Sequence, residues 1–148
     1  MTYQPLVSII MNCLNGERFV SQAIESVFAQ TYPNWEIIFL DNASTDRTSE
    51  IAQSFGTRVR YFKNLQTVPL GEARNQALQK TKGELVAFLD ADDTWFPDKL
   101  LKQVPLFGNR PEIGLVYSDT ELIFEHNGHT KKYFKAHQCE PLRGYIFE

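Results

Sequence analysis

The sequence predicts an α/β protein in which helices flank a mostly parallel sheet. Over the first two thirds of the chain, short β-branched or aromatic runs alternate with segments of helical period, which is the pattern of consecutive β-α-β units. The chain has 148 residues, of which 43% are hydrophobic and 22% charged, as in an ordinary globular domain. We therefore expect residues 1–148 to form one domain.

The first strand, the first helix and the second strand follow one another closely. Residues 7–11 form a nearly continuous apolar run, which suits a central strand buried on both faces. Apolar residues then recur at helical spacing over 17–30, as on a helix with one broad buried stripe. Residues 35–40 form the second predicted strand, which stops at Asp41.

The second helix is expected soon after this strand, because Ser44 or Thr45 can cap it with Asp46 in its first turn. A weaker strand over 58–63 precedes a helix over 69–80. The inward positions of that helix are predicted to be Leu70, Ala73, Ala77 and Leu78.

The next strand is predicted over 85–89, the most apolar run of the chain, and the acidic residues 90–93 follow it directly. Pro97 fits the first position of a further helix, which Pro105 ends. The apolar face of that helix is predicted to comprise Leu100, Leu101 and Val104.

The pattern then changes to antiparallel. Residues 114–117 and 121–124 are predicted strands, and Asn127-Gly128 is a strong two-residue turn signal before a strand over 131–134. We therefore expect an antiparallel hairpin near the C-terminus.

Composition and missing motifs exclude several classes of protein. A formal net charge of −3 argues against binding to a nucleic-acid backbone. Cys13 and Cys139 show no metal-ligand spacing, and no run approaches the ~18 apolar residues of a membrane span. The chain has no Walker A sequence, no GxGxxG after its first strand and no GxSxG, which disfavours NTPases, dinucleotide oxidoreductases and serine hydrolases.

Polar side chains follow three of the predicted parallel strands. They run from Asn12 to Asn15 after the first strand, and they include Asp41 after the second and Asp90 and Asp92 after the strand over 85–89. Ligands of open α/β sheets bind beyond the carboxyl ends of the parallel strands. We therefore expect these residues to share one binding site.

The strongest of these signals is the sequence Asp90-Ala91-Asp92-Asp93. Three carboxylates within four residues repel one another and attract a counter-ion. A hard divalent cation, Mg²⁺ or Mn²⁺, would offset this repulsion and hold substrate phosphates. In the alternative interpretation, Asp92 or Asp93 lies near the start of the next helix and the other carboxylates are solvated.

Asp41 and Arg74 also have two interpretations each. The Asp41 carboxylate can accept hydrogen bonds from a base or a ribose, or it can cap the following helix. Arg74 can bind a phosphate, a uracil carbonyl or a carboxylate such as that of Asp41, or it is an ordinary surface arginine.

Five short segments occur in a distinctive order, with the sequences VSIIMNCLN (7–15), QTYPNWE (30–36), LDNASTD (40–46), GEARN (71–75) and FLDADD (88–93). Together they resemble the family 2 glycosyltransferases over residues 5–125. The resemblance implies the GT-A fold, a Rossmann-like architecture, and an inverting enzyme that uses a nucleotide-diphosphate sugar.

The resemblance also implies roles for individual residues. Asn12 and Leu14, followed by Asn15, match the loop that approaches the nucleoside, while Asp41 and Arg74 match groups near a uracil base. Asp90, Ala91 and Asp92 match the DXD motif, with Asp92 as the direct metal ligand and Asp90 near the ribose or the metal. The implied cofactor is Mn²⁺ or Mg²⁺.

The chain departs from the family pattern in three places. Asn12 and Leu14 stand where a proline or threonine and a tyrosine are commoner, and residues 42–43 are Asn-Ala instead of Asp-Gly, which makes the turn stiffer. The downstream motif that carries the family's catalytic base is not found. We therefore expect an incomplete donor-binding domain, truncated at its C-terminal side, whose catalytic residue is unknown.

These inferences lead to one preferred function and two rivals. We expect transfer of a sugar, most simply from a UDP-sugar, to a hydroxyl of a carbohydrate or lipid-linked acceptor in polysaccharide biosynthesis. The main alternative is a non-catalytic nucleotide-binding or regulatory module of the same fold. A nucleotidyltransferase is disfavoured because residues 12–16 contain no Lys or Arg. We expect a cytoplasmic protein, or one peripheral at the inner face of the membrane, with no nucleic-acid partner and with homodimerisation left open.

Overall fold

The structure is a computed structural model, and it describes residues 3–108, 110, 112–123 and 130–132. The chain divides into two compact units, Met1–Glu112 and Ile113–Glu148. The first contains a four-stranded sheet with its helices, and the second contains a pair of short strands. None of the helices in the described residues is long and apolar enough to traverse a membrane.

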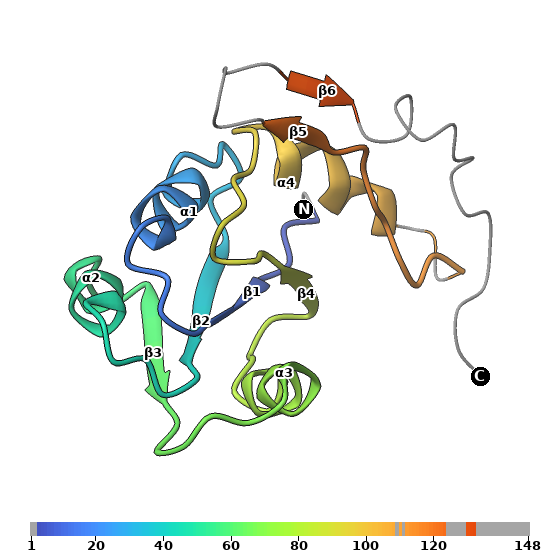
Figure 1. Cartoon of the computed structure of the whole chain (residues 1–148). Helices are drawn as coiled ribbons and strands as arrows, with labels where there is room; N and C mark the ends of the chain where they lie inside the picture. Colours follow the sequence, from blue (N-terminus) through green and yellow to red (C-terminus); the bar gives the residue numbers. More distant parts are fainter. Residues whose placement is uncertain (1–2, 109, 111, 124–129, 133–148) are drawn as a thin grey trace. The chain divides into compact units, whose positions relative to one another are not determined.

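Four parallel strands form the sheet of the first unit in the order β3-β2-β1-β4 (Figure 1). Their bounds are β1 Val7–Cys13, β2 Trp35–Asp41, β3 Val59–Lys63 and β4 Leu85–Phe88. In the register of the sheet, Val7 lies between Trp35 and Leu85. The predicted parallel α/β sheet is confirmed.

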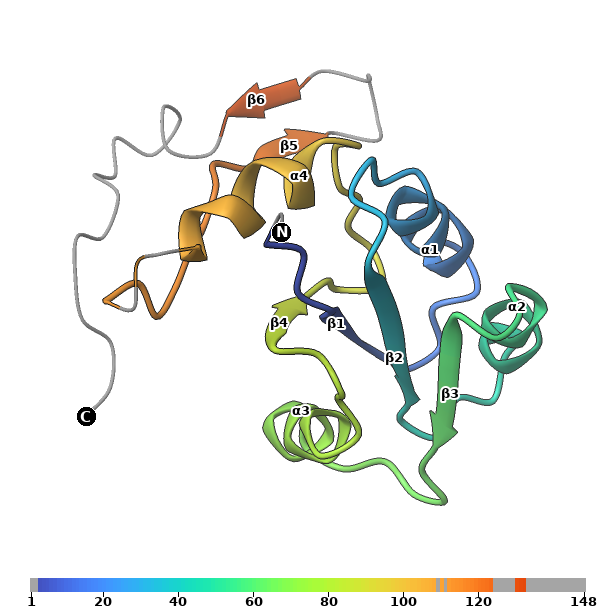
Figure 2. The ribbon, with the colours of Figure 1, turned by 180° about the vertical axis from the view of Figure 1, so that it is seen from behind.

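Helices cover both faces of this sheet (Figures 1 and 2). Their bounds are α1 Val20–Phe28, α2 Thr48–Ser54, α3 Leu70–Leu78 and α4 Lys99–Gln103, with a 3-10 helix, η1, over Val104–Phe107. Helices α1 and α2 lie on one face and α3 on the other. Pro105 ends the α-helical hydrogen bonding of α4, as its fixed φ and missing N–H predict.

Each face of the sheet has its own hydrophobic core. The larger core, on the side of α1, α2 and α4, includes Ile9, Met11, Ile24, Ile37, Phe39 and Leu100. The smaller core, under α3, comprises Ile10, Ile38, Leu40, Ala73 and Ala77. Successive residues of β1 and β2 therefore enter opposite cores, which explains why both strands are almost continuously apolar.

Several apolar positions are more exposed than the sequence predicted. Strand β4 pairs only with β1 among the described residues, so Val86 and Phe88 remain 39% and 53% exposed although this is the most apolar run. The predicted inward positions that prove to be exposed are Leu70, Leu78 and Leu101. Helix α3 buries its alanines, Ala73 and Ala77, against the sheet.

Two predicted boundaries also need correction. Helix α2 begins at Thr48, and neither Ser44 nor Thr45 caps it, because the loop after β2 is longer than the prediction allowed. Instead, Asp46 Oδ1 accepts the Thr48 backbone N–H at 3.0 Å. Residues 114–117 form no strand.

The described part of the second unit contains one antiparallel strand pair. Strand β5, Glu121–Ile123, pairs with β6, Thr130–Lys132. The predicted turn at Asn127-Gly128 lies outside the described residues.

Candidate functional site

The carboxyl ends of β1, β2 and β4 meet at one edge of the sheet. Asp41 lies opposite Cys13 in the register, and Asn42 donates its backbone N–H to the Cys13 oxygen at 2.7 Å. The Leu89 N–H donates to the Ile10 oxygen at 3.0 Å, so Asp90 follows β4 beside the end of β1. Parallel pairing thus brings together segments that are up to about 80 residues apart in the sequence.

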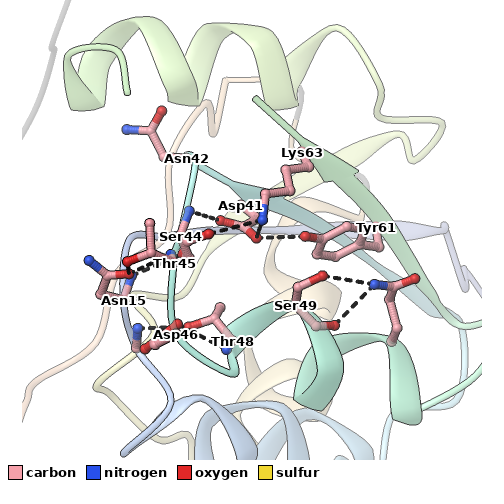
Figure 3. Close-up of polar contacts among 12 residues, drawn as sticks. Asn15, Asp41, Asn42, Ser44, Thr45, Asp46, Thr48, Ser49, Tyr61 and Lys63 are labelled. Atoms are coloured by element: carbon pink, nitrogen blue, oxygen red, sulfur yellow. Dashed lines mark hydrogen bonds and ion pairs between the residues drawn. The ribbon is translucent and has the colours of Figure 1, made fainter. Parts of the chain in front are cut away.

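Asp41 is fully buried, and its carboxylate forms hydrogen bonds and an ion pair with other residues of the protein (Figure 3). Oδ1 accepts the backbone N–H of Ser44 at 2.7 Å, and Oδ2 accepts the Tyr61 hydroxyl at 2.5 Å. Lys63 Nζ lies 3.5 Å from Oδ2. The carboxylate therefore holds the turn between β2 and α2, and a ligand would reach it only if one of these partners moved.

The pKa values of this group follow from its contacts. Burial favours the neutral acid, but hydrogen bonds from Ser44 and Tyr61 and the charge of Lys63 outweigh it, so the pKa of Asp41 lies below its usual value. Burial and the hydrogen bond to Asp41 raise the pKa of Tyr61 to about 12. At neutral pH the carboxylate is ionised and the phenol is protonated.

Hydrogen bonds join the β1–α1 loop to the β2–α2 loop (Figure 3). Two backbone N–H groups of the first loop donate to side chains of the second at 3.0 Å, in the pairs Asn15 to Ser44 and Glu17 to Asp46. A third, that of Gly16, donates to the Thr48 hydroxyl at the start of α2 at 2.9 Å. In return, Asn15 Oδ1 accepts the Thr45 N–H at 2.9 Å. The side chain of Asn15 therefore connects the two loops.

Both loops contain a left-handed residue. Asn15 has φ 54° and Ala43 has φ 69°. Asparagine tolerates this region because its short side chain hydrogen-bonds locally, whereas a Cβ without such compensation costs roughly 1–2 kcal/mol there. Ala43 is thus a strained position within the turn that Asp41 holds.

Asn42 points away from the Asp41 network (Figure 3). Its side chain makes hydrogen bonds with Asn64 and Val68 in the loop before α3. The end of β2 is therefore connected to the start of α3 by a polar side chain.

Arg74 pairs with Asp90 rather than with Asp41, which corrects one of the partners considered from the sequence. Its Nη2 lies 2.9 Å from Asp90 Oδ1, and its guanidinium carbon lies 6.0 Å from the centre of the Phe88 ring. The pair borders a cavity of about 320 Å³, which is lined by Arg74, Phe88, Leu89, Asp90, Asp93 and Trp95.

The carboxylates after β4 affect one another at Asp93. Burial and then the charges of Asp92 and Asp90 raise the pKa of Asp93 above its usual value. A cation at this position would relieve the repulsion. Within the described part of the chain, no three His, Cys, Asp or Glu side chains are grouped so as to hold a metal ion, so a metal bound by Asp90 and Asp92 would need further oxygen ligands, such as phosphates and water.

The remaining predicted site residues lie along the same edge. Asn12 precedes the last residue of β1, and its Nδ2 is buried with no hydrogen-bond partner in the described structure. An unpaired buried donor costs roughly 1–3 kcal/mol, so an acceptor at this point would be stabilising. Leu14 is 48% exposed in the β1–α1 loop, and Ala91 is half-buried between the acidic residues.

Sequence reasoning missed Tyr61, Lys63 and the cross-loop role of Asn42. A signal for the first two exists: they alternate along β3, and in the register Tyr61 lies beside Phe39 and Lys63 beside Asp41. A period of two places both on the face that Asp41 occupies. No local signal marks Asn42, because its partners lie 22 to 26 residues away.

The model of the family "Glycosyl transferase family 2" matches residues 8–145. A curated relative, the UDP-Glc:alpha-D-GlcNAc-diphosphoundecaprenol beta-1,3-glucosyltransferase WfgD of Escherichia coli, is 37% identical over 119 residues. The match covers 80% of this chain and 47% of that protein. The chain spans less than half the length of the curated relatives it matches, between 23% and 44% for three of them.

Two solved structures resemble the fold. The mannosyltransferase PcManGT from Pyrobaculum calidifontis, in complex with GDP-Man and Mn²⁺, has a TM-score of 0.68 and 26% identity, and the match covers 73% of this chain and 34% of that one. S. aureus TarS 1-349 in complex with UDP-GlcNAc has a TM-score of 0.63 and 27% identity, with coverage of 65% and 29%.

Proposed function

This chain belongs to glycosyl transferase family 2, and we propose that it is the donor-binding part of an enzyme that transfers sugar from a nucleotide-diphosphate sugar. The observation that carries this proposal is the cavity after β4, where the Arg74 guanidinium meets the carboxylate of Asp90, with Asp93 beside it. Cationic and anionic groups together at the carboxyl edge of a parallel sheet suit a phosphate ligand with a divalent metal.

The diphosphate would lie in this cavity. The guanidinium of Arg74 is a planar donor suited to phosphate oxygens, and the carboxylates of Asp90 and Asp92 are hard oxygen ligands. Mn²⁺ or Mg²⁺ held by them and by the diphosphate would stabilise the charge of the leaving nucleotide. The cavity supports this placement because Asp90 and Asp93 line it together with Arg74, and a cation there would offset the negative charges that surround Asp93.

The nucleoside would lie toward the ends of β1 and β2. We propose that Asn12 offers its unpaired Nδ2 to a base carbonyl and that Leu14 and Ala91 provide apolar contact. Asn15 and Asp41 contribute chiefly by holding the two loops, because their side chains are bound within the chain. We infer that the donor is a UDP-sugar.

The reaction that follows from this arrangement is direct displacement with inversion at the anomeric carbon. An acceptor hydroxyl would attack while the nucleotide diphosphate leaves, and a carboxylate base would take the hydroxyl proton. We assign the donor side to this chain and leave the base unassigned. We propose, by analogy with the E. coli relative, that the acceptor is a lipid-linked or other carbohydrate and that the reaction belongs to polysaccharide biosynthesis. A protein that is cytoplasmic or peripheral at the inner face of the membrane is part of the same proposal.

The test is calorimetric titration of UDP, UDP-sugars and GDP into the protein with and without Mn²⁺. Asp92→Ala removes a proposed metal ligand, and Asp98→Ala removes an acidic side chain that instead pairs with Lys102. We expect metal-dependent UDP binding that Asp92→Ala abolishes and Asp98→Ala leaves intact. Binding of no nucleotide, or equal binding by both variants, would refute the proposal. UDP binding without sugar transfer by any longer form would favour the non-catalytic alternative.

A further inference from the structure

The Asn42 side chain fastens the loop before α3 to the end of β2. Its Oδ1 accepts Asn64 Nδ2 and the Val68 backbone N–H, both at 3.1 Å, and its Nδ2 donates to the Val68 oxygen at 2.8 Å. Its backbone oxygen also accepts the Thr67 hydroxyl at 3.2 Å. Asn42 is only 7% exposed, so losing one of these bonds would leave a shielded polar group unpaired.

Helix α3 depends on such polar anchors because it packs weakly against the sheet. Its buried residues are two alanines, Ala73 and Ala77, which offer little apolar area. No side chain caps its N-terminus. Its C-terminal end is held by Arg60, whose Nη1 donates to the Lys80 oxygen at 2.7 Å.

The arginine of the cavity lies one turn into α3, so its position depends on where the first turn of the helix is held. Val68 lies two residues before the helix starts at Leu70, and Arg74 follows one turn later. A displacement of this turn would therefore move the guanidinium away from Asp90, to which it now lies at 2.9 Å.

We propose that Asn42 is a positioning residue for Arg74, because its carboxamide sets the N-terminal end of α3 and thereby the Arg74–Asp90 pair. The consequence for nucleotide diphosphates rests on the proposed function, whereas the positioning itself does not. Asn42 is thus a link between the turn after β2 and the cavity after β4.

The contacts require an amide. A carboxylate of the same size retains an acceptor oxygen for Asn64 and the Val68 N–H, but it replaces the Nδ2 donor by a second oxygen and brings a negative charge against the Val68 oxygen. Asn42→Asp is therefore the decisive substitution. The matched control is Asn34→Asp, because Asn34 Nδ2 donates to a backbone oxygen of Gln4 at 2.9 Å from a position just before β2, at the opposite edge of the sheet.

The first measurement uses the ligand-free protein. The NMR signals of the Arg74 guanidinium, assigned with Arg74→Lys, report its pairing with Asp90. We expect Asn42→Asp to shift these signals toward their positions in Asp90→Ala, and Asn34→Asp to leave them unchanged. If Asn42→Asp fails to fold, Asn64→Ala removes one of the same bonds and should cause a smaller shift in the same direction. Signals unchanged in the folded variant overturn the proposal.

The second measurement is the affinity for UDP with Mn²⁺. We expect Asn42→Asp to weaken binding about tenfold in the parent chain but less than about threefold when Arg74 is already alanine, since residues that act through one another are not additive. Equal losses in both backgrounds overturn the proposal. A parent chain that does not bind UDP refutes the proposed function, and the NMR comparison then still decides the positioning role.

Discussion

Replacing Ala43 by glycine should stabilise the protein. Ala43 has φ 69° in the turn that Asp41 holds, and only glycine enters this region without a steric cost. Ala43→Gly therefore places there the residue that the backbone favours.

The magnitude follows from two opposing terms. Removing the Cβ relieves roughly 1–2 kcal/mol of left-handed strain in the folded protein. Glycine also raises the conformational entropy of the unfolded chain, which lowers the free energy of unfolding by roughly 0.4–1 kcal/mol. The midpoints of these two ranges differ by about 0.8 kcal/mol, so the free energy of unfolding should rise by about 0.5–1 kcal/mol. For a chain of this size, a gain of this order raises Tm by roughly 1–4 °C.

Urea unfolding followed by circular dichroism measures this gain, with Gly56→Ala as the reciprocal control. Gly56 has φ 79°, and a methyl group added there would meet no atom within 4 Å. The same two terms then act with opposite sign, so Gly56→Ala should lower the free energy of unfolding by about 0.5–1 kcal/mol.

The reasoning is refuted if Ala43→Gly is no more stable than the parent while Gly56→Ala loses stability as expected. That result would mean that contacts of the Ala43 methyl group outweigh the backbone strain. Loss of stability in both variants would lead to the same conclusion.

Three further predictions concern the sheet and its buried charges. Gly83→Ala would place a methyl group 2.5 Å from a backbone oxygen, so it should lower the free energy of unfolding, measured in urea, by about 1–3 kcal/mol. Gly71→Ala adds a methyl group in open space on a helix and should raise the free energy of unfolding by about 0.5–1 kcal/mol. Equal effects of the two substitutions would contradict the contact argument. Glu36 has a lowered pKa, because its hydrogen bonds outweigh its burial, so its stabilisation is complete above the usual glutamate pKa and is lost as the pH falls through the lower folded value. Glu36→Gln should thus cost about 1.5–3 kcal/mol at neutral pH, and a cost that does not shrink in acid would count against this. Tyr61→Phe removes a hydrogen bond to the Asp41 carboxylate, so it should raise the pKa of Asp41 and move acid unfolding to higher pH. An unchanged pH midpoint of acid unfolding would show that the hydroxyl does not stabilise the ionised carboxylate.

Local patterns predicted the strands and helices well because their signals are short-range. The apolar run of β1 and the stripe of α1 mark buried elements regardless of what covers them. The same patterns failed at Leu70 and Phe88, which are apolar yet exposed. Periodicity identifies the apolar face of an element, but the extent of burial depends on how closely neighbours approach.

The candidate site was predicted as a set of strand ends but not as a set of contacts. Parallel topology is enough to bring Asn12, Asp41 and Asp90 to one edge. Which partner each one takes depends on register and on loop paths. Arg74 therefore pairs with Asp90 instead of Asp41. Asp41 accepts a hydrogen bond from Tyr61, whose place beside it follows from the register of β2 and β3.

The sequence by itself determined the family, the alternation of strands and helices, and the acidic residues that follow β4, because each of these is marked by a pattern of residues close together in the sequence. The tertiary structure alone decided that Asp41 is an internal carboxylate and that Asn42 links β2 to α3. The physical reason is the same for both. A buried polar atom must be paired, and its partner is chosen by which distant segments the packed sheet brings within hydrogen-bonding distance.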